Sequence, residues 1–297
     1  ILCGPHVTAL PRNALENEFV DYVLIGEYEY ALKNLVNALG AGKDTRGLKG
    51  VCSRDGSKII INARAPLIED LNEMPYPLRD SLPMKKYIDP FCKHSPNAQM
   101  ISSRGCPNQC IFCLEPVVYG KRNYRMRSAE NVVDEMEYLI EGYKVKEIYF
   151  DDSSFSVNRT RVEKICQEIM SRGIDIYWSC MADSKLRKDT LKKMNSAGCA
   201  ALKFGVETAD MQILKNVHKP FSNQDAKAVV KDCKDVGIET HATFVFGLPG
   251  ETPKTIEKTM EFAFELGTDT AQFSSVIPFP GTELFEIAKK NNWLVTK

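Results

Sequence analysis

The sequence predicts an α/β fold built from repeated strand–helix units around a parallel sheet. From residue 99 onward, short apolar runs alternate with longer segments of helical periodicity. The apolar runs are nearly continuous, as expected for strands that are covered on both faces. Glycines follow four helical segments, where a left-handed residue can end a helix and turn the chain back; they are Gly173, Gly198, Gly237 and Gly267. These three observations indicate a repeating βα unit.

Six strands are expected in the part of the chain after residue 98. They lie near Gln99–Ser103, Glu147–Phe150, Asp175–Cys180, Ala200–Val206, Glu239–Phe246 and Thr270–Ile277. Between them, the helical segment 128–141 is the clearest, because Ser128 can cap its first turn and apolar residues recur at three- and four-residue steps. Similar stripes run through Val162–Ile169 and Ala226–Val236. Each of these helices should bury one face.

Upstream of the repeating units the composition changes. Leu48–Ser53 and Lys58–Ile61 flank Asp55-Gly56, which predicts a short β-hairpin. The following stretch has little periodicity and is rich in proline, which is typical of a linker or wrapping segment. Its prolines are Pro66, Pro75, Pro77, Pro83, Pro90 and Pro96.

Three cysteines form a CxxxCxxC pattern directly after the first expected strand. They are Cys106, Cys110 and Cys113. Four-iron clusters that only carry electrons are normally held by four thiolates. A triplet without a fourth cysteine nearby would leave one iron open to an outside ligand. The pattern therefore favours a catalytic cluster.

Two simpler explanations of the cysteines were weighed. A structural zinc site needs a second pair of ligands, but there is no other CxxC or HxxxH pair and the nearest histidine is His94, upstream in the proline-rich stretch. A disulfide framework is disfavoured because the 10 cysteines in 297 residues are mostly scattered through apolar segments and no secretory segment is seen at the start. We expect reduced thiols and a cytoplasmic location.

The triplet, with the aromatic Phe112 just before its third cysteine, resembles the signature of the radical S-adenosylmethionine (SAM) superfamily. The resemblance implies that Cys106, Cys110 and Cys113 bind a 4Fe-4S cluster whose fourth iron is chelated by SAM. It further implies that one electron cleaves SAM to a 5′-deoxyadenosyl radical. The fold implied is a partial (β/α)6 TIM-like barrel, in which chemistry takes place at the carboxyl ends of the strands.

The resemblance also assigns cofactor-binding residues to these strand ends. Asp152 and Ser153 would contact the amino group of SAM, although both residue types also commonly cap helices. Glu207 would accept the ribose hydroxyls, although an acid at a helix start is often only favourable to the helix dipole. Phe112, Thr243 and Gly247 complete the set, with the segment around Gly247 at the adenine side. The role of His241 stays open.

The first residues resemble the last third of a cobalamin-binding Rossmann-like domain. The resemblance rests on the turns Gly4–Pro11 and Gly26–Glu29, although Tyr28 replaces the usual glycine and the DxHxxG motif for the cobalt ligand is absent. Pro278–Thr282 likewise resembles the cobalamin-associated branch of the superfamily. About forty residues are too few to bury a stable core, so we expect the chain to be a fragment. The expected domains are 1–41 (Rossmann-like remnant), 42–97 (hairpin and linker) and 98–297 (partial barrel).

The net charge of the chain excludes few classes of binding partner. Lys and Arg number 39 and so do Asp and Glu, so no global basic field favours nucleic acid. A local basic and aromatic patch at Lys121–Arg127 could meet RNA or an anionic substrate, but such runs often pair with nearby acids such as Glu130. We favour a small-molecule substrate over RNA. No apolar run approaches the about twenty residues that a membrane-spanning helix needs.

The sequence therefore predicts a radical SAM enzyme, with a flavodoxin or ferredoxin as the implied reductant. Cobalamin-associated methyl transfer or cyclisation on an unreactive carbon is the favoured reaction, and cobalamin is expected in the full-length parent. A methylthiotransferase is the main rival, but its relatives carry another cysteine triplet, and Cys3, Cys52 and Cys92 are poorly clustered. A non-catalytic iron–sulfur or zinc protein is the alternative from another class. The substrate, any catalytic acid or base and the oligomeric state are left open.

Overall fold

The computed structural model describes residues 1–87, 89 and 92–295. Of the predicted features, Pro90 and the last two residues of the barrel range lie outside the described residues. The chain forms two compact units. Unit 1 comprises Ile1–Glu69, Gly105–Asn123 and Ile277–Lys297, and unit 2 comprises Asp70–Arg104 and Tyr124–Val276. This grouping differs from the predicted domain ranges, which stay predictions.

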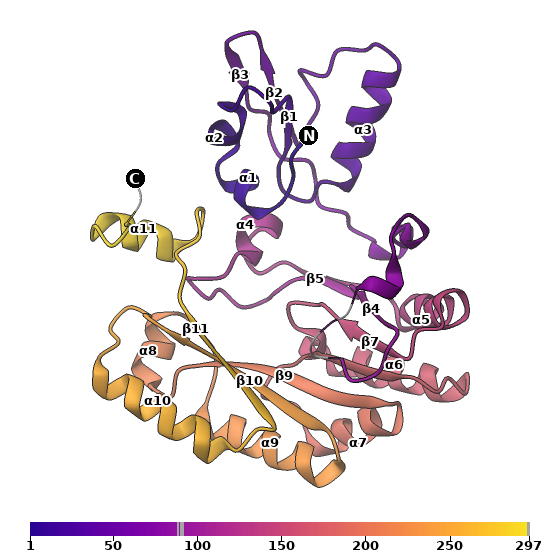
Figure 1. Cartoon of the computed structure of the whole chain (residues 1–297), viewed down its shortest axis with the longest axis vertical. Coiled ribbons are helices and arrows are strands. Elements are labelled where there is room, and N and C mark those ends of the chain that lie inside the picture. Colours follow the sequence, from indigo (N-terminus) through magenta and orange to yellow (C-terminus); the bar gives the residue numbers. More distant parts are fainter. Residues whose placement is uncertain (88, 90–91, 296–297) are drawn as a thin grey trace. The chain divides into compact units, whose positions relative to one another are not determined.

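Unit 2 is built on a six-stranded sheet (Figure 1). Its strands are β4 (Asn97–Met100), β7 (Glu147–Phe150), β8 (Tyr177–Met181), β9 (Cys199–Glu207), β10 (Glu239–Phe246) and β11 (Thr270–Ser275). Every neighbouring pair is parallel. The six predicted strands are confirmed, with ends that differ by a few residues.

The order of the strands in the sheet equals their order in the chain, β4-β7-β8-β9-β10-β11. A doubly wound sheet reverses its order at a switch point, whereas a barrel adds each strand beside the last. Sequential order therefore assigns unit 2 to the barrel type. It also brings the carboxyl ends of all six strands to one edge of the sheet.

The helices of unit 2 lie along the outer face of this curved sheet (Figure 1). They are α5 (Ala129–Tyr143), α6 (Arg159–Ser171), α7 (Lys188–Ser196), α8 (Met211–Asn216), α9 (Asn223–Val236) and α10 (Pro253–Leu266). The Ser128 cap of α5 is confirmed, because its hydroxyl accepts a hydrogen bond from the Asn131 amide at 3.2 Å. The four glycines predicted to follow helices all have positive φ. Among the described residues no helix combines the length and apolar character needed to cross a membrane.

The core of unit 2 lies between the sheet and these helices. Phe150, Phe155 and Trp178 pack edge-on and tilted with ring centroids 4.7 to 5.6 Å apart. The indole of Trp178 is fully buried and donates to the Ala197 carbonyl at 2.7 Å, so its one polar group is satisfied. Strand residues at alternate positions point into this layer, for example Leu202, Phe204 and Phe244.

The opposite face of the sheet is polar, unlike the packed interior of a closed barrel. Lys203 and His241 are register neighbours on it, and Thr270 stands beside His241. Tyr149 and Ser179 are register neighbours on the same face, nearer to the amino ends of the strands. Since this face lacks a continuous apolar layer, it is suited to water or a polar ligand rather than to a core.

The proline-rich segment is more than a linker, because its second half is part of compact unit 2. Arg79, which lies in a short 3₁₀ turn at Arg79–Ser81, is buried and donates to the Gln99 carbonyl of edge strand β4 at 3.0 Å. It also pairs with Glu135 of α5 at 2.8 Å. Arg127 binds the other oxygen of the Glu135 carboxylate. The segment thus covers the open edge of the sheet and ties it to a helix.

Unit 1 contains a three-stranded sheet of order β1-β2-β3, formed by Tyr22–Leu24, Val51–Asp55 and Lys58–Ile60. The last two form the predicted hairpin, which is confirmed. Its helices are α1 (Pro5–Ala9), α2 (Pro11–Leu15), α3 (Glu29–Gly40), α4 (Glu115–Tyr119) and α11 (Glu283–Lys290), and the short strands β5 (Ser103–Gly105) and β6 (Tyr124–Met126) adjoin it in the chain.

Residues 1–41 of unit 1 provide one parallel element, an isolated bridge between Leu2 and Val23. Strand β1 then pairs antiparallel with β2. The amide of Gly26 donates to the Thr8 hydroxyl at 3.0 Å, which joins the two turns on which the resemblance rested. A Rossmann-like remnant here stays a prediction.

The buried ion pair of the wrapping segment gives a first test. Arg79→Met should lower the free energy of unfolding by about 2–4 kcal/mol, because Glu135 would lose one of its two cations in a buried site. Urea unfolding of the purified chain measures the loss. Arg46→Met is the matched control, since the pairs of Arg46 with Asp44 and Asp55 are exposed and its removal should leave the midpoint unchanged. Equal effects of the two substitutions would contradict the role given to Arg79.

Candidate functional site

The cysteine segment belongs to unit 1 and turns sharply on itself. The amide of Cys113 donates to the Cys110 carbonyl at 3.1 Å. Burial, together with the charges of Glu115, Cys110 and Cys106, raises the pKa of the Cys113 thiol to about 11. Cys106 and Cys110 are therefore near enough to Cys113 to oppose its ionisation. Cationic iron would remove this penalty, so the donor set fits an iron–sulfur cluster.

A cavity of about 290 Å³ lies beside Cys110 and Cys113 within unit 1. The segment is anchored there, because the Leu284 amide of α11 donates to the Ile111 carbonyl at 2.9 Å. Phe112, between the anchored residue and the third cysteine, is half-buried. The backbone is thus held at Ile111 while the thiols on either side keep room for a ligand.

The remaining cysteines do not extend this ligand set. Cys180 and Cys199 are buried in the apolar core of unit 2, and burial raises their pKa well above the usual range. Across residues 1–87, 89 and 92–295, no three His, Cys, Asp or Glu side chains converge on one point as the ligands of a single ion would. A four-iron cluster does not require this, because each thiolate binds a different iron.

Two carboxylates, those of Asp151 and Asp152, follow the carboxyl end of β7 and differ in burial. Asp152 is buried, and its oxygens accept from the Ser102 amide at 2.6 Å and from the hydroxyls of Ser102 and Ser103 at 2.5 and 2.7 Å. Asp151 and Ser153 on either side of it are exposed. Partial burial and the charge of Asp152 raise the pKa of Asp151. The predicted contact of Asp152 with SAM stays a prediction, but its oxygens already have three donors.

Glu207 ends β9 in an unusual backbone conformation. It has a φ of 65°, which is left-handed and uncommon for a residue with a side chain. Its carboxylate pairs with Lys219 at 2.8 Å. A Cβ on Gly205 would stand 2.5 Å from that carboxylate and 2.8 Å from the Lys219 ammonium. The absence of a side chain at Gly205 therefore allows the Glu207–Lys219 ion pair to lie over the strand.

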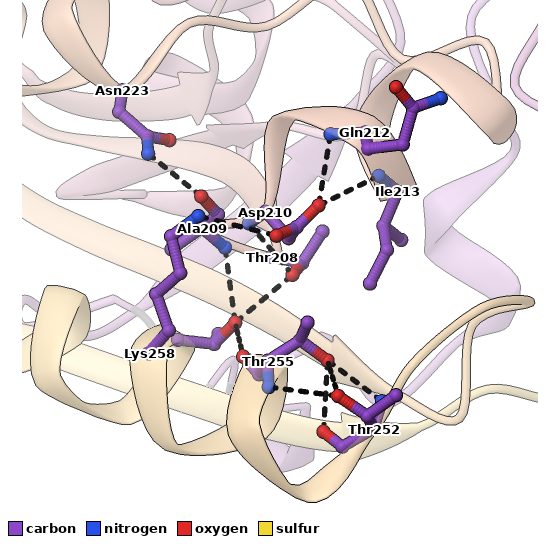
Figure 2. A network of polar contacts seen from close by, with 10 residues as sticks. Thr208, Ala209, Asp210, Gln212, Ile213, Asn223, Thr252, Thr255 and Lys258 are labelled. Carbon is purple, nitrogen blue, oxygen red and sulfur yellow. Dashed lines mark hydrogen bonds and ion pairs between the residues drawn. The ribbon is translucent and has the colours of Figure 1, made fainter.

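The residues after Glu207 are held by a polar network that reaches α8 and α10 (Figure 2). The hydroxyl of Thr259 on α10 accepts from the Ala209 amide at 3.1 Å and lies 3.0 Å from the Thr208 hydroxyl. Asp210 caps α8 by accepting from Gln212 and Ile213, and it pairs with Lys258 of α10 at 3.2 Å. This network fixes the backbone that gives Glu207 its left-handed turn.

Thr243 and Gly247 lie on the neighbouring strand and its end. Thr243 is the register partner of Gly205, and Phe244 is that of Glu207, across an irregularity in the ladder. Gly247 has a φ of 90°, and its amide donates to Glu251. The structure thus places Glu207 and Gly247 at the carboxyl ends of β9 and β10, with Thr243 inside β10 beside Gly205. Their roles in binding SAM stay predictions.

A cavity of about 510 Å³ opens on the polar face of the sheet in unit 2 and extends to the amino ends of its strands, where Glu147, Tyr177 and Glu239 line it. Its walls include Tyr149, Ser179, Lys203 and His241. The Ser179 hydroxyl is buried and has no hydrogen-bond partner among the described residues. Burial lowers the pKa of Lys203, and burial together with the charge of Lys203 lowers that of His241. The volume is in the usual range for small-molecule sites.

The basic patch at 121–127 is not a uniform surface. Arg127 is buried and paired with Glu135, not with Glu130 as the sequence suggested. It also donates to Asn131 at 2.6 Å. Arg127, which is buried, therefore stabilises the fold and is not available at the surface of the patch.

The two residues that set the position of the Glu207 carboxylate, Lys219 and Gly205, were not singled out from the sequence. Lys219 lies in a loop twelve residues beyond Glu207. Nothing in its local pattern distinguishes it from a solvated lysine. Gly205 sits inside a strand, and a glycine there is a known sign of close approach by another group.

A family model described as the Radical SAM superfamily matches residues 100–263. The chain is 36% identical over 298 residues to an uncharacterized methyltransferase of Pyrococcus horikoshii, covering 100% of this chain and 64% of that protein. It is 31% identical over 296 residues to an anaerobic magnesium-protoporphyrin IX monomethyl ester cyclase of Cereibacter sphaeroides, covering 96% and 48%. The chain thus spans 48% to 64% of the length of these two relatives.

Among solved structures, the chain is similar to the radical SAM methyltransferase TsrM of Kitasatospora setae, solved with cobalamin and a 4Fe-4S cluster bound. The TM-score is 0.79 at 21% identity, over 97% of this chain and 57% of that one. This similarity shows a shared fold.

The network behind Glu207 can be tested by Thr259→Val, which keeps the shape of a fully buried side chain but removes its hydroxyl. The substitution should lower the free energy of unfolding by about 1–3 kcal/mol, because the Ala209 amide loses its acceptor. Hydrogen–deuterium exchange should also speed up at residues 207–209. Thr160→Val, at an exposed position on α6, is the control and should do neither. Unchanged exchange in Thr259→Val would contradict the anchoring role of the network.

Proposed function

Because the chain belongs to the radical SAM superfamily, we propose that Cys106, Cys110 and Cys113 bind a 4Fe-4S cluster on which SAM is reductively cleaved. The observation that carries the proposal is the CxxxCxxC segment inside the matched range 100–263, with a cavity beside Cys110 and Cys113 and with Cys180 and Cys199 enclosed in the core of unit 2. When bound, the reduced cluster supplies the electron that breaks a sulfonium C–S bond of SAM. The remaining roles belong to side chains of the chain.

Glu207 is proposed to accept the ribose hydroxyls of SAM. Its carboxylate is oriented by Lys219, by the absence of a side chain at Gly205 and by the left-handed turn that the Thr208–Thr259 network fixes. Such preorganisation lowers the cost of ordering a side chain when ligand binds.

Thr243 and Gly247 of β10 and its end, and Phe112 on the cysteine segment, are proposed as adenine-side contacts. Ser153, exposed after β7, is proposed to accept from the amino group.

The cavity on the polar face of the sheet is proposed to hold a small-molecule substrate. Its unsatisfied Ser179 hydroxyl and the neighbouring Lys203 and His241 offer polar contacts that could orient a substrate. A small molecule is favoured over RNA because Arg127 is withdrawn from the basic patch.

Methyl transfer or cyclisation assisted by cobalamin is the proposed reaction class. Two relatives are named as a methyltransferase and a cyclase, and the TsrM structure contains cobalamin. Residues 1–41 are proposed as the remnant of a corrinoid-side domain, supported by the parallel bridge at Leu2 and the Thr8–Gly26 contact. A flavodoxin or ferredoxin is proposed as reductant, and a reducing cytoplasm as the location.

Methylthiotransfer is the second candidate, since a putative methylthiotransferase of Methanocaldococcus jannaschii is 25% identical over 291 residues. A second cluster would need three more cysteines. Cys3 is exposed and Cys52 is buried in an apolar cluster of unit 1, while Cys92 belongs to unit 2. This distribution supports methyl transfer or cyclisation over methylthiotransfer.

The ligand assignment is tested by Cys110→Ala. After anaerobic reconstitution with iron and sulfide, this variant should lose the brown colour and most of the bound iron, because one of three thiolates is gone. Cys180→Ala is the matched control and should bind iron as the wild type does. Iron content equal to wild type in Cys110→Ala would refute its role as a ligand.

The preorganised Glu207 is tested by Gly205→Ala. The new methyl group must displace the Glu207–Lys219 pair, which should raise the SAM concentration that gives half of the cluster's spectral response by about 5- to 30-fold, the equivalent of about 1–2 kcal/mol. The free energy of unfolding should change little, because only side-chain ends move. Gly142→Ala on α5, where a methyl group meets nothing within 4 Å, is the control. Unchanged SAM dependence would remove Glu207 from the proposed site.

A further inference from the structure

Ser102 and Ser103 lie where the chain passes from β4 toward the cysteine segment, and both are almost fully buried. Every hydrogen-bonding group of Ser102 has a partner. Its amide and hydroxyl donate to Asp152, and its carbonyl accepts from the Arg127 amide at 3.0 Å and from the Arg161 guanidinium at 2.8 Å. The Ser103 hydroxyl donates to Asp152 as well. Cys106 follows three residues later.

We infer that Asp152 and Arg161 are positioning residues that hold Ser102 and Ser103 in one conformation, so that the cysteine segment starts from a fixed point. The inference rests on the proposed cluster-binding function. It gives Asp152 a role other than the predicted contact with SAM.

The geometry of Asp152 favours this role over direct contact with the cofactor. Its side chain accepts three hydrogen bonds of 2.5 to 2.7 Å, and the residue is 2% exposed. Three of its about four acceptor positions are therefore already used, and an ammonium group of a ligand could reach the remaining one only if this buried side chain became accessible. Asp151 and Ser153, by contrast, are exposed at the same strand end.

Arg161 completes the arrangement from α6. Its guanidinium donates to the Arg127 carbonyl at 2.9 Å in addition to the Ser102 carbonyl, and it lies over the ring of Phe155 with 5.5 Å to the centroid. Burial lowers its pKa, while the negative charge of Asp152 acts in the opposite direction. The buried side chains of Asp152 and Arg161 therefore attract each other, and both form hydrogen bonds with Ser102. A lysine has no planar fork and cannot make both hydrogen bonds of Arg161.

A double-mutant cycle separates positioning from cofactor contact. Wild type, Ser103→Ala, Asp152→Asn and the double variant are reconstituted anaerobically and reduced. The 5′-deoxyadenosine formation rate and the SAM dependence of the cluster's electron paramagnetic resonance spectrum are then measured. If Asp152 positions the serines, Ser103→Ala and Asp152→Asn should each slow formation by about tenfold or more at saturating SAM, and the double variant should be no slower than Asp152→Asn. The half-saturating SAM concentration should change by less than about threefold.

The opposite pattern would overturn the inference. If Asp152 binds the amino group of SAM, Asp152→Asn should raise the half-saturating SAM concentration while Ser103→Ala behaves as wild type. Arg161→Lys gives an independent variant, and it should reproduce the slow rate of Ser103→Ala. A wild-type cluster that ignores SAM would overturn the proposed function itself, and the inference with it.

Asp269→Asn is the control for a general loss of stability. The Asp269 carboxylate likewise accepts from a main-chain amide and a hydroxyl, those of Thr240, at 2.7 and 2.9 Å. It lies at the amino end of the sheet, away from Ser102. The thermal midpoint of Asp269→Asn should fall, but its 5′-deoxyadenosine rate should equal that of wild type. An equally slow Asp269→Asn would show that the effect of Asp152 is one of stability and would overturn the inference.

Discussion

The sequential parallel order of the six strands is the constraint on which the rest of unit 2 depends. Each strand is added beside the last, so all carboxyl ends share one edge and the residues after β7, β9 and β10 are brought together. Glu207 and Thr243 become neighbours only through the register of β9 and β10. Apolar residues at alternate positions bind the outer helices, which leaves the other face free to carry Ser179, Lys203 and His241.

Buried charges then fix the details at this edge. Asp152 and Arg161 hold the serines before the cysteine segment, and Glu135 joins two arginines that close the edge strand. Buried charges are costly unless they are paired and hydrogen-bonded, and these have several partners each. Their value to the protein is that they allow few alternative conformations.

The sequence alone predicted the six strands, the hairpin and the cap at Ser128, because these depend on local periodicity and turn chemistry. Glu207 was singled out by the resemblance to the radical SAM superfamily and not by its local pattern, and its role in binding SAM stays a prediction. The sequence did not reveal Lys219 or Gly205, because their importance arises from a contact between a strand and a loop that lie apart in the chain. It assigned Arg127 to a surface patch because the local pattern does not show that its partner Glu135 is buried when α5 packs against the rest of unit 2.

The central claim is that one iron of a three-cysteine cluster is open to SAM. The most direct measurement is electron paramagnetic resonance of the anaerobically reconstituted and reduced wild-type chain, with and without SAM, alongside an assay for 5′-deoxyadenosine. We expect a 4Fe-4S signal that changes when SAM is added, together with formation of 5′-deoxyadenosine. A cluster signal that does not respond to SAM, or stoichiometric zinc in place of iron, would contradict it.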